Sequence, residues 1–65
     1  MQFIRATRTN GALVLINLDH ITAVQLEASE TLRYTAIILH NGREIDVTEL
    51  PEDLLQPSGP YLLEL

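Results

Sequence analysis

The stretch from Ile4 to Ile16 reads Ile-Arg-Ala-Thr-Arg-Thr-Asn-Gly-Ala-Leu-Val-Leu-Ile and places the pair Asn10-Gly11 between two β-permissive runs. A second pair, Asn41-Gly42, follows another apolar run. Asn-Gly between hydrophobic runs is the strongest short-range signal for a β-hairpin, and a type I′ turn needs φ > 0 at both central residues. The two pairs therefore predict two hairpins with type I′ turns.

The flanking residues predict five strands and one short helix. The run Ala12–Asn17 does not alternate between apolar and polar residues, which is typical of a strand buried on both faces. The segment 43–47 alternates cleanly, so Ile45 and Val47 are expected to point inward. Thr48 is a candidate N-cap, and Pro51 suits a first helical turn. The expected strands lie at residues 3–9, 12–17, 21–27, 32–40 and 43–47, and the expected helical turn lies within 48–55.

These elements predict a mostly β fold, either a five-stranded antiparallel meander or a small SH3-like open barrel with one short C-terminal helical turn. The β domain is expected to span residues 1–56. Residues 57–65 form an apolar C-terminal tail, which is expected to pack on its own subunit or on a neighbouring one, because unsupported chain ends are usually disordered.

The size of the chain favours self-association. It has 65 residues, 46% of them hydrophobic, and no Cys, so neither a disulfide nor a Cys-based zinc site stabilises it. One thin sheet with a single helical turn cannot cover a strand that is apolar on both faces. A homo-oligomer is therefore expected.

The charge pattern disfavours nucleic acid as a partner. The net charge is −5, and all four basic residues are Arg, so the chain has little with which to neutralise phosphates. Residues 44–65 contain six acids and no base, whereas residues 1–18 contain two Arg and no acid. The acidic end is expected to be a solvated surface. The other interpretations are head-to-tail contacts between copies and attraction of a basic partner.

No targeting segment is evident, and the longest apolar run, Ala12–Ile16, is too short to cross a bilayer. A cytoplasmic protein without membrane insertion is expected.

Groups able to perform chemistry are few. His20 and His40 lie far apart in the sequence and lack the spacing of a metal-binding cluster, and no Ser lies in a nucleophile elbow. Glu44 and Asp46 share one face of a strand, but their alternation with apolar residues places them in solvent, away from acid–base work. The sequence predicts no catalytic residue, no metal and no cofactor, and hence no enzyme.

The run Ile4–Gly11, the segment Val14–Asn17, Ile21 and the stretch Tyr34–Val47 together resemble the FlbD/SwrD family of small flagellum-associated bacterial proteins. The resemblance covers roughly residues 4–55. It departs from the family in its acidic late hairpin and in the tail after residue 57. It implies the fold described above and a link to motility, and it implies no catalytic residues. A LytTR-type DNA-binding domain has a similar passage but needs a longer chain and a basic face.

Two functions are therefore expected. The first is a non-enzymatic protein-interaction module, homo-oligomeric, of uncharacterised role and associated with the flagellum. The alternative is an acidic regulatory or inhibitory protein of a phage or mobile element that binds a basic partner. The expected interaction residues are Leu13, Leu15, Tyr61, Leu62, Leu63, Leu65, Glu44 and Asp46.

Overall fold

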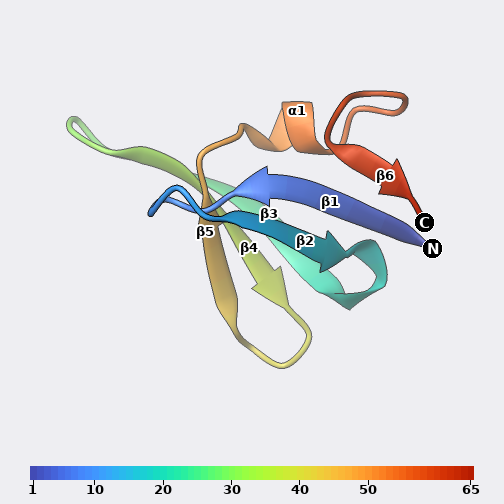
Figure 1. Cartoon of the computed structure of the whole chain (residues 1–65). Helices are drawn as coiled ribbons and strands as arrows, with labels where there is room; N and C mark the ends of the chain where they lie inside the picture. The colour runs from blue at the N-terminus through green and yellow to red at the C-terminus, as the bar shows by residue number, and fades with distance from the viewer.

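Strands dominate the computed structural model, which describes residues 1–65 (Figure 1). The elements are β1 (Gln2–Thr7), β2 (Leu13–Asn17), the 3₁₀ turn η1 (Leu18–His20), β3 (Ile21–Ala28), β4 (Arg33–Leu39), β5 (Glu44–Val47), α1 (Pro51–Leu54) and β6 (Leu62–Glu64). The prediction of a small, mostly β protein is confirmed.

Both Asn-Gly pairs form hairpin turns, but the turns are not type I′. Only the glycines have positive φ, +92° at Gly11 and +84° at Gly42. In the first turn the Gly11 amide donates to the Arg8 carbonyl at 2.8 Å, and Asn10 Oδ1 accepts from the Ala12 amide at 3.0 Å. The second turn repeats this pattern. The type I′ prediction was wrong because each Asn side chain bonds to the backbone two residues later from a normal φ, and only the glycine enters the left-handed region.

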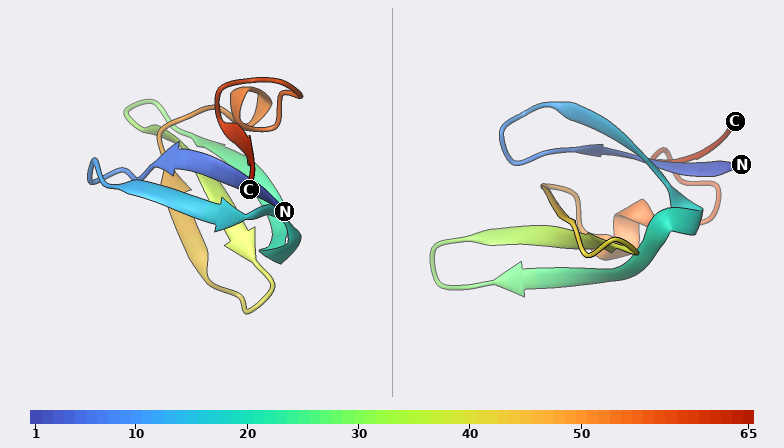
Figure 2. Two further views of the ribbon diagram at one scale, coloured as in Figure 1. Left: turned by 45° about the vertical axis from the view of Figure 1, so that its right-hand side comes forward. Right: turned by 90° about the horizontal axis from the view of Figure 1, so that it is seen from below.

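The strands form two antiparallel sheets of three, in the orders β2-β1-β6 and β3-β4-β5. The two sheets lie as layers, and η1 carries the chain from one to the other (Figure 2). Asn17 Oδ1 accepts from the Asp19 amide at 3.0 Å and so caps this turn. The structure therefore differs from a single five-stranded meander in two ways: η1 separates β2 from β3, and β6 adds a sixth strand.

The end of β1 also contacts the second sheet. The Thr48 amide donates to the Thr7 carbonyl at 2.9 Å, and the Thr9 amide donates to the Asp46 carbonyl at 3.2 Å. An isolated bridge between Arg8 and Val47 lies between these bonds. The two sheets are therefore joined along one edge, as in a small open barrel.

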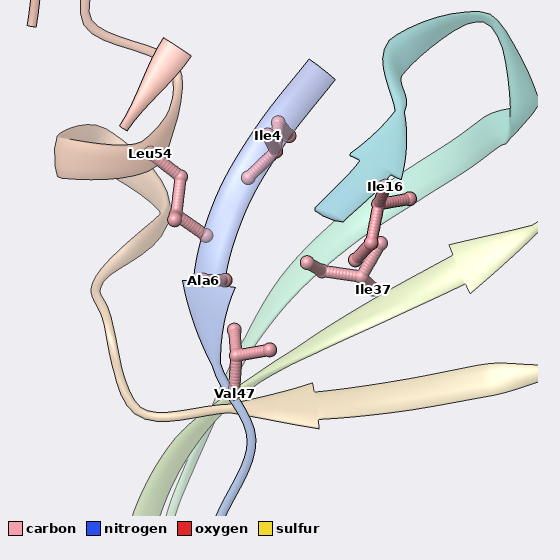
Figure 3. Close-up of a cluster of buried hydrophobic side chains, with 6 residues drawn as sticks. All are labelled: Ile4, Ala6, Ile16, Ile37, Val47 and Leu54. Carbon is pink, nitrogen blue, oxygen red and sulfur yellow. The ribbon is translucent and has the colours of Figure 1, made fainter. Parts of the chain in front are cut away.

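The core lies between the two layers (Figure 3). Six apolar side chains from both sheets and α1 meet there and are 0–4% exposed: Ile4, Ala6, Ile16, Ile37, Val47 and Leu54. Only 8 of the 65 residues are buried, which reflects the poor ratio of volume to surface in a chain of this length.

The single helix is one turn long, as expected, but Thr48 does not cap it. The N-cap is Leu50, which makes no side-chain capping bond, and Pro51 occupies the first helical turn. Thr48 still belongs to the extended chain, because its amide is bonded to Thr7. Pro51, which fixes φ and needs no partner for its nitrogen, starts the helix in place of a side-chain cap.

The C-terminal segment pairs with β1 of the same chain. In β6, Leu63 is opposite Phe3 and Leu62 is opposite Ile4. The Met1 amino group lies 3.0 Å from Glu64 Oε1 in the same ladder. Within this chain the tail therefore extends the sheet that β1 and β2 form.

Candidate interaction surfaces

The outer face of the sheet β2-β1-β6 is mostly apolar. Side chains directly opposite one another in antiparallel strands share a face, and Ile4 and Ile16 point to the core. The alternate residues therefore point outward. We call the surface formed by Phe3, Arg5, Leu13, Leu15 and Leu63 the apolar face. Leu13 is 60% exposed and Leu15 is 48% exposed, while Phe3 and Leu63 are half-buried.

The strand β2 that carries these leucines is also a sheet edge. Its sequence, Leu13 to Asn17, contains no charged residue and no Pro. Natural edge strands usually carry charges, Pro or bulges, because a bare apolar edge pairs with other chains. Only Val14 and Ile16 of this strand turn to the core. The other two apolar residues, Leu13 and Leu15, are therefore available to a partner.

One cation lies on the apolar face. Arg5 is directly opposite Leu15 and is exposed. The one ion pair in the structure joins the Met1 amino group and Glu64, so none of the four arginines is paired with a carboxylate. Arg5 is therefore free to bind an anionic group on a partner.

The outer face of the other sheet, β3-β4-β5, is acidic. The register aligns Gln25, Ala36 and Asp46 in one row, and Ala23, Ile38 and Glu44 in the next; Glu27 lies opposite Tyr34. We call the surface formed by Glu27, Tyr34, Ile38, Glu44 and Asp46 the acidic face. It contains three carboxylates and no basic residue, although Arg43 follows at its end in the β4–β5 turn.

The carboxylates of the acidic face are close enough to shift the pKa values of two of its groups. Partial burial, followed by the charges of Asp46, Glu27 and Glu44, raises the pKa of the Tyr34 hydroxyl. The pKa of Glu44 is raised because its protonated carboxyl can hydrogen-bond to Asp46, and because the charge of Asp46 disfavours a second carboxylate. In addition, Asp46 Oδ1 is buried and accepts no hydrogen bond. A cation placed here would offset the charge repulsion between these carboxylates and could bind the free Asp46 oxygen.

The acidic run expected from residue 44 onward is not one surface. Glu44 and Asp46 share one face, as their alternation with Ile45 and Val47 predicted, but only Glu44 is exposed, because Asp46 is half-buried with a buried Oδ1. The carboxylate of Glu49 instead accepts the Thr7 amide, at 2.9 and 3.1 Å. Two further acids lie in the first turn of α1: Glu52 and Asp53. The acidic face therefore includes Glu27 of β3, which lies outside the acidic run of the sequence. It excludes Glu49, whose carboxylate is bonded to Thr7.

The remaining predicted interaction residues are divided between core and solvent. Leu63 belongs to the apolar face, whereas Tyr61 and Leu62 pack against the core. Leu65 is 69% exposed at the chain end. The structure thus brings Leu13, Leu15 and Leu63 together on the apolar face, and Glu44 and Asp46 on the acidic face.

The sequence interpretation did not identify Phe3, Glu27 and Tyr34 as interaction residues. Arg5 was evident in the sequence as a basic residue of the first strand, but its place beside Leu15 depends on the hairpin register. Glu27 and Tyr34 face each other only because β3 and β4 pair as they do.

His40 follows β4 and bonds to η1 and to β3. Its Nε2 donates to the Asp19 carbonyl at 2.9 Å, so in the neutral ring Nδ1 accepts the hydroxyl proton of Thr22, 2.8 Å away. The His40 amide also donates to the His20 carbonyl. Thr22 reaches His40 because the β3–β4 register shifts between Ile21 and Ala23. Although far apart in the sequence, the two histidines are neighbours, and both line one hollow.

We expect His40→Ala to lower the free energy of unfolding by about 1 kcal/mol, because it removes two side-chain hydrogen bonds, one to η1 and one to β3. Thermal melting followed by circular dichroism would show a fall of about 4–8 °C. His20→Ala is the matched control, because His20 contributes only its backbone carbonyl to this contact. Equal losses in the two variants would contradict this role for the His40 ring.

The three surface hollows are small. Their volumes are about 200, 250 and 230 Å³, below the roughly 300–1,000 Å³ of small-molecule sites. No group of three or more His, Cys, Asp and Glu side chains is arranged to hold a metal ion. The extended surfaces are therefore the stronger candidates for function.

The comparisons with known proteins identify no relative. No family model matches the chain, and no curated protein or solved structure matches it either. None of the helices in the structure has the length and apolar character needed to cross a membrane. Function must therefore be argued from the surfaces of the chain itself.

Proposed function

We propose that this chain is a non-enzymatic protein-interaction module that self-associates through the apolar face. The observation that carries the proposal is the pair of exposed leucines, Leu13 and Leu15, on an edge strand without a charged residue or Pro. Contiguous exposed apolar surface of this kind marks contact sites in natural proteins. Self-association also supplies the burial that a chain with 8 buried residues lacks.

The cellular setting is part of the proposal. The resemblance of residues 4–55 to the FlbD/SwrD family supports a bacterial, flagellum-associated assembly as the place where the module works. The proposed compartment for this module is the cytoplasm.

The test is the mass of the wild-type chain against the variant Leu13→Ser/Leu15→Ser, by size exclusion with light scattering from micromolar to millimolar concentration. We expect the wild type to exceed the mass of one chain. The variant should need about tenfold higher concentration or more to associate, which corresponds to about 1.4 kcal/mol. Its melting temperature should change little, because both side chains are exposed.

Leu55→Ser is the matched control, because Leu55 is 43% exposed but follows α1, outside the apolar face and the acidic face. It should associate like the wild type. A folded wild-type chain that stays monomeric throughout the concentration range would refute the proposed self-association.

A second candidate function rests on the acidic face. We propose as this second candidate a regulatory or inhibitory protein of a phage or mobile element that binds a basic partner. The three carboxylates of this face, none of them in an ion pair, favour binding to a cationic surface. A polyarginine peptide is a suitable probe, and its affinity should fall steeply with salt. Glu44→Gln/Asp46→Asn should weaken binding, whereas the control Glu52→Gln/Asp53→Asn should not. Equal affinity of both variants would exclude this surface.

A further inference from the structure

We infer that the occupant of the apolar face is the acidic face of a second copy of the same chain, so that copies join head to tail. This inference rests on the proposed self-association and adds which two surfaces meet. The apolar face has one cation that is in no ion pair, and the acidic face has three carboxylates that are in no ion pair. Each surface therefore lacks what the other presents.

Charge decides between this arrangement and a symmetric one. The whole chain carries −5, so copies repel unless opposite charges meet locally. Two apolar faces placed together would bring Arg5 near its counterpart and leave the acidic face uncovered. Placing Arg5 against Glu44 and Glu27 instead joins opposite charges and supplies a cation near Asp46, whose buried Oδ1 has no partner.

The apolar residues of the two surfaces also match. Leu13 and Leu15 project from one surface, and the half-buried Ile38 and Tyr34 lie among the carboxylates of the other. A tyrosine ring offers an apolar body to leucine and a face on which an Arg guanidinium can stack. Contact of these groups would remove apolar area from water at the same time as it pairs the charges.

The two surfaces cannot meet within one chain. They are the outer faces of two layers that enclose the core, so they point away from each other (Figure 2). A contact between different surfaces of identical chains is heterologous, and it continues into a ring or a filament. The assembly should therefore grow past a dimer as the concentration rises.

The experiment uses two charge-reversed forms of the full chain, Arg5→Glu on the apolar face and Glu27→Arg/Glu44→Arg on the acidic face. All three positions are exposed, so the fold should be kept, as melting followed by circular dichroism will show. Light scattering should show that each form alone needs about tenfold higher concentration or more to associate. In an equal mixture, the apolar face of each form can meet the acidic face of the other form. Both of these junctions join opposite charges, so association should recover.

The controls reverse charges elsewhere. Arg33 and Glu52 lie outside both surfaces, so the variants Arg33→Glu and Glu52→Arg should associate like the wild type. The unmodified chain provides a measurement that needs no variant, because its association should weaken as salt screens the junction.

The outcomes separate this inference from the proposed function. If the wild-type chain is monomeric, both the proposed self-association and the head-to-tail junction are refuted. If the wild type associates and Glu27→Arg/Glu44→Arg associates equally well, self-association is supported but the head-to-tail junction is overturned. A mixture that associates no better than its two components overturns the junction as well, as does association that is indifferent to salt.

Discussion

Replacing Leu54 with Ala is expected to lower the free energy of unfolding by about 2–5 kcal/mol, because truncating a fully buried Leu loses burial and leaves a cavity. Leu54 is 0% exposed and is the one residue of α1 that enters the core between β1 and β3 (Figure 3). A domain of this length is expected to have a total stability of only about 3–10 kcal/mol. The substitution should therefore remove a large share of it.

Urea denaturation measures this effect, as a fall in the midpoint with an unchanged slope. Leu55→Ala is the matched control, since Leu55 is adjacent but 43% exposed. The control should lose well under half as much stability. Similar midpoints for the two variants would show that α1 is not a necessary part of the core.

Replacing Glu49 with Ala is expected to lower the free energy of unfolding by about 1–3 kcal/mol, because it leaves the part-buried Thr7 amide without a hydrogen-bond partner. Along one edge of β1, the Arg5 amide donates to the Tyr61 carbonyl, and the Thr7 carbonyl accepts from the Thr48 amide. Between these two bonds the Thr7 amide has no backbone partner, and both carboxylate oxygens of Glu49 accept from it instead. The side chain thus completes the ladder where β1 passes from β6 to β5.

The same residue is held by its backbone, because the Thr35 hydroxyl donates to the Glu49 carbonyl. Glu49→Gln keeps an acceptor for Thr7 and should recover much of the stability that Glu49→Ala loses. Glu52→Ala, at an exposed position in α1, is the control. Thermal melting, combined with hydrogen exchange at the Thr7 amide, gives the measurement. Rapid exchange in the wild type would contradict the bond.

The sequence predicted the hairpins because a turn is a local structure. Asn10-Gly11 and Asn41-Gly42 carry their own hydrogen-bonding groups and the one residue type that enters the left-handed region freely. The turn type was wrong for an equally local reason, which is the bond from each Asn side chain to the second amide after it.

Interaction residues were harder to predict than the hairpins. Which residues share a surface depends on the register between strands and on the sheet to which each strand belongs. Leu13 and Leu15 were identified from an apolar run that has too many hydrophobic residues for one face. Tyr61 and Leu62 looked equally available but pack against the core once β6 pairs with β1. An apolar residue in the sequence can therefore belong either to a contact surface or to the core, and the sequence alone does not distinguish the two.

The amino-acid sequence by itself determined the mostly β class, the positions of both hairpins and the excess of apolar residues in β2. These properties follow from turn chemistry and from side-chain periodicity, which act over a few residues. The tertiary structure decided that Arg5 lies beside Leu15, that Glu27 joins Glu44 and Asp46, and that Glu49 bonds to Thr7. Those arrangements depend on which strands pair and which layer they join, and strand pairing brings together residues that are distant in the chain.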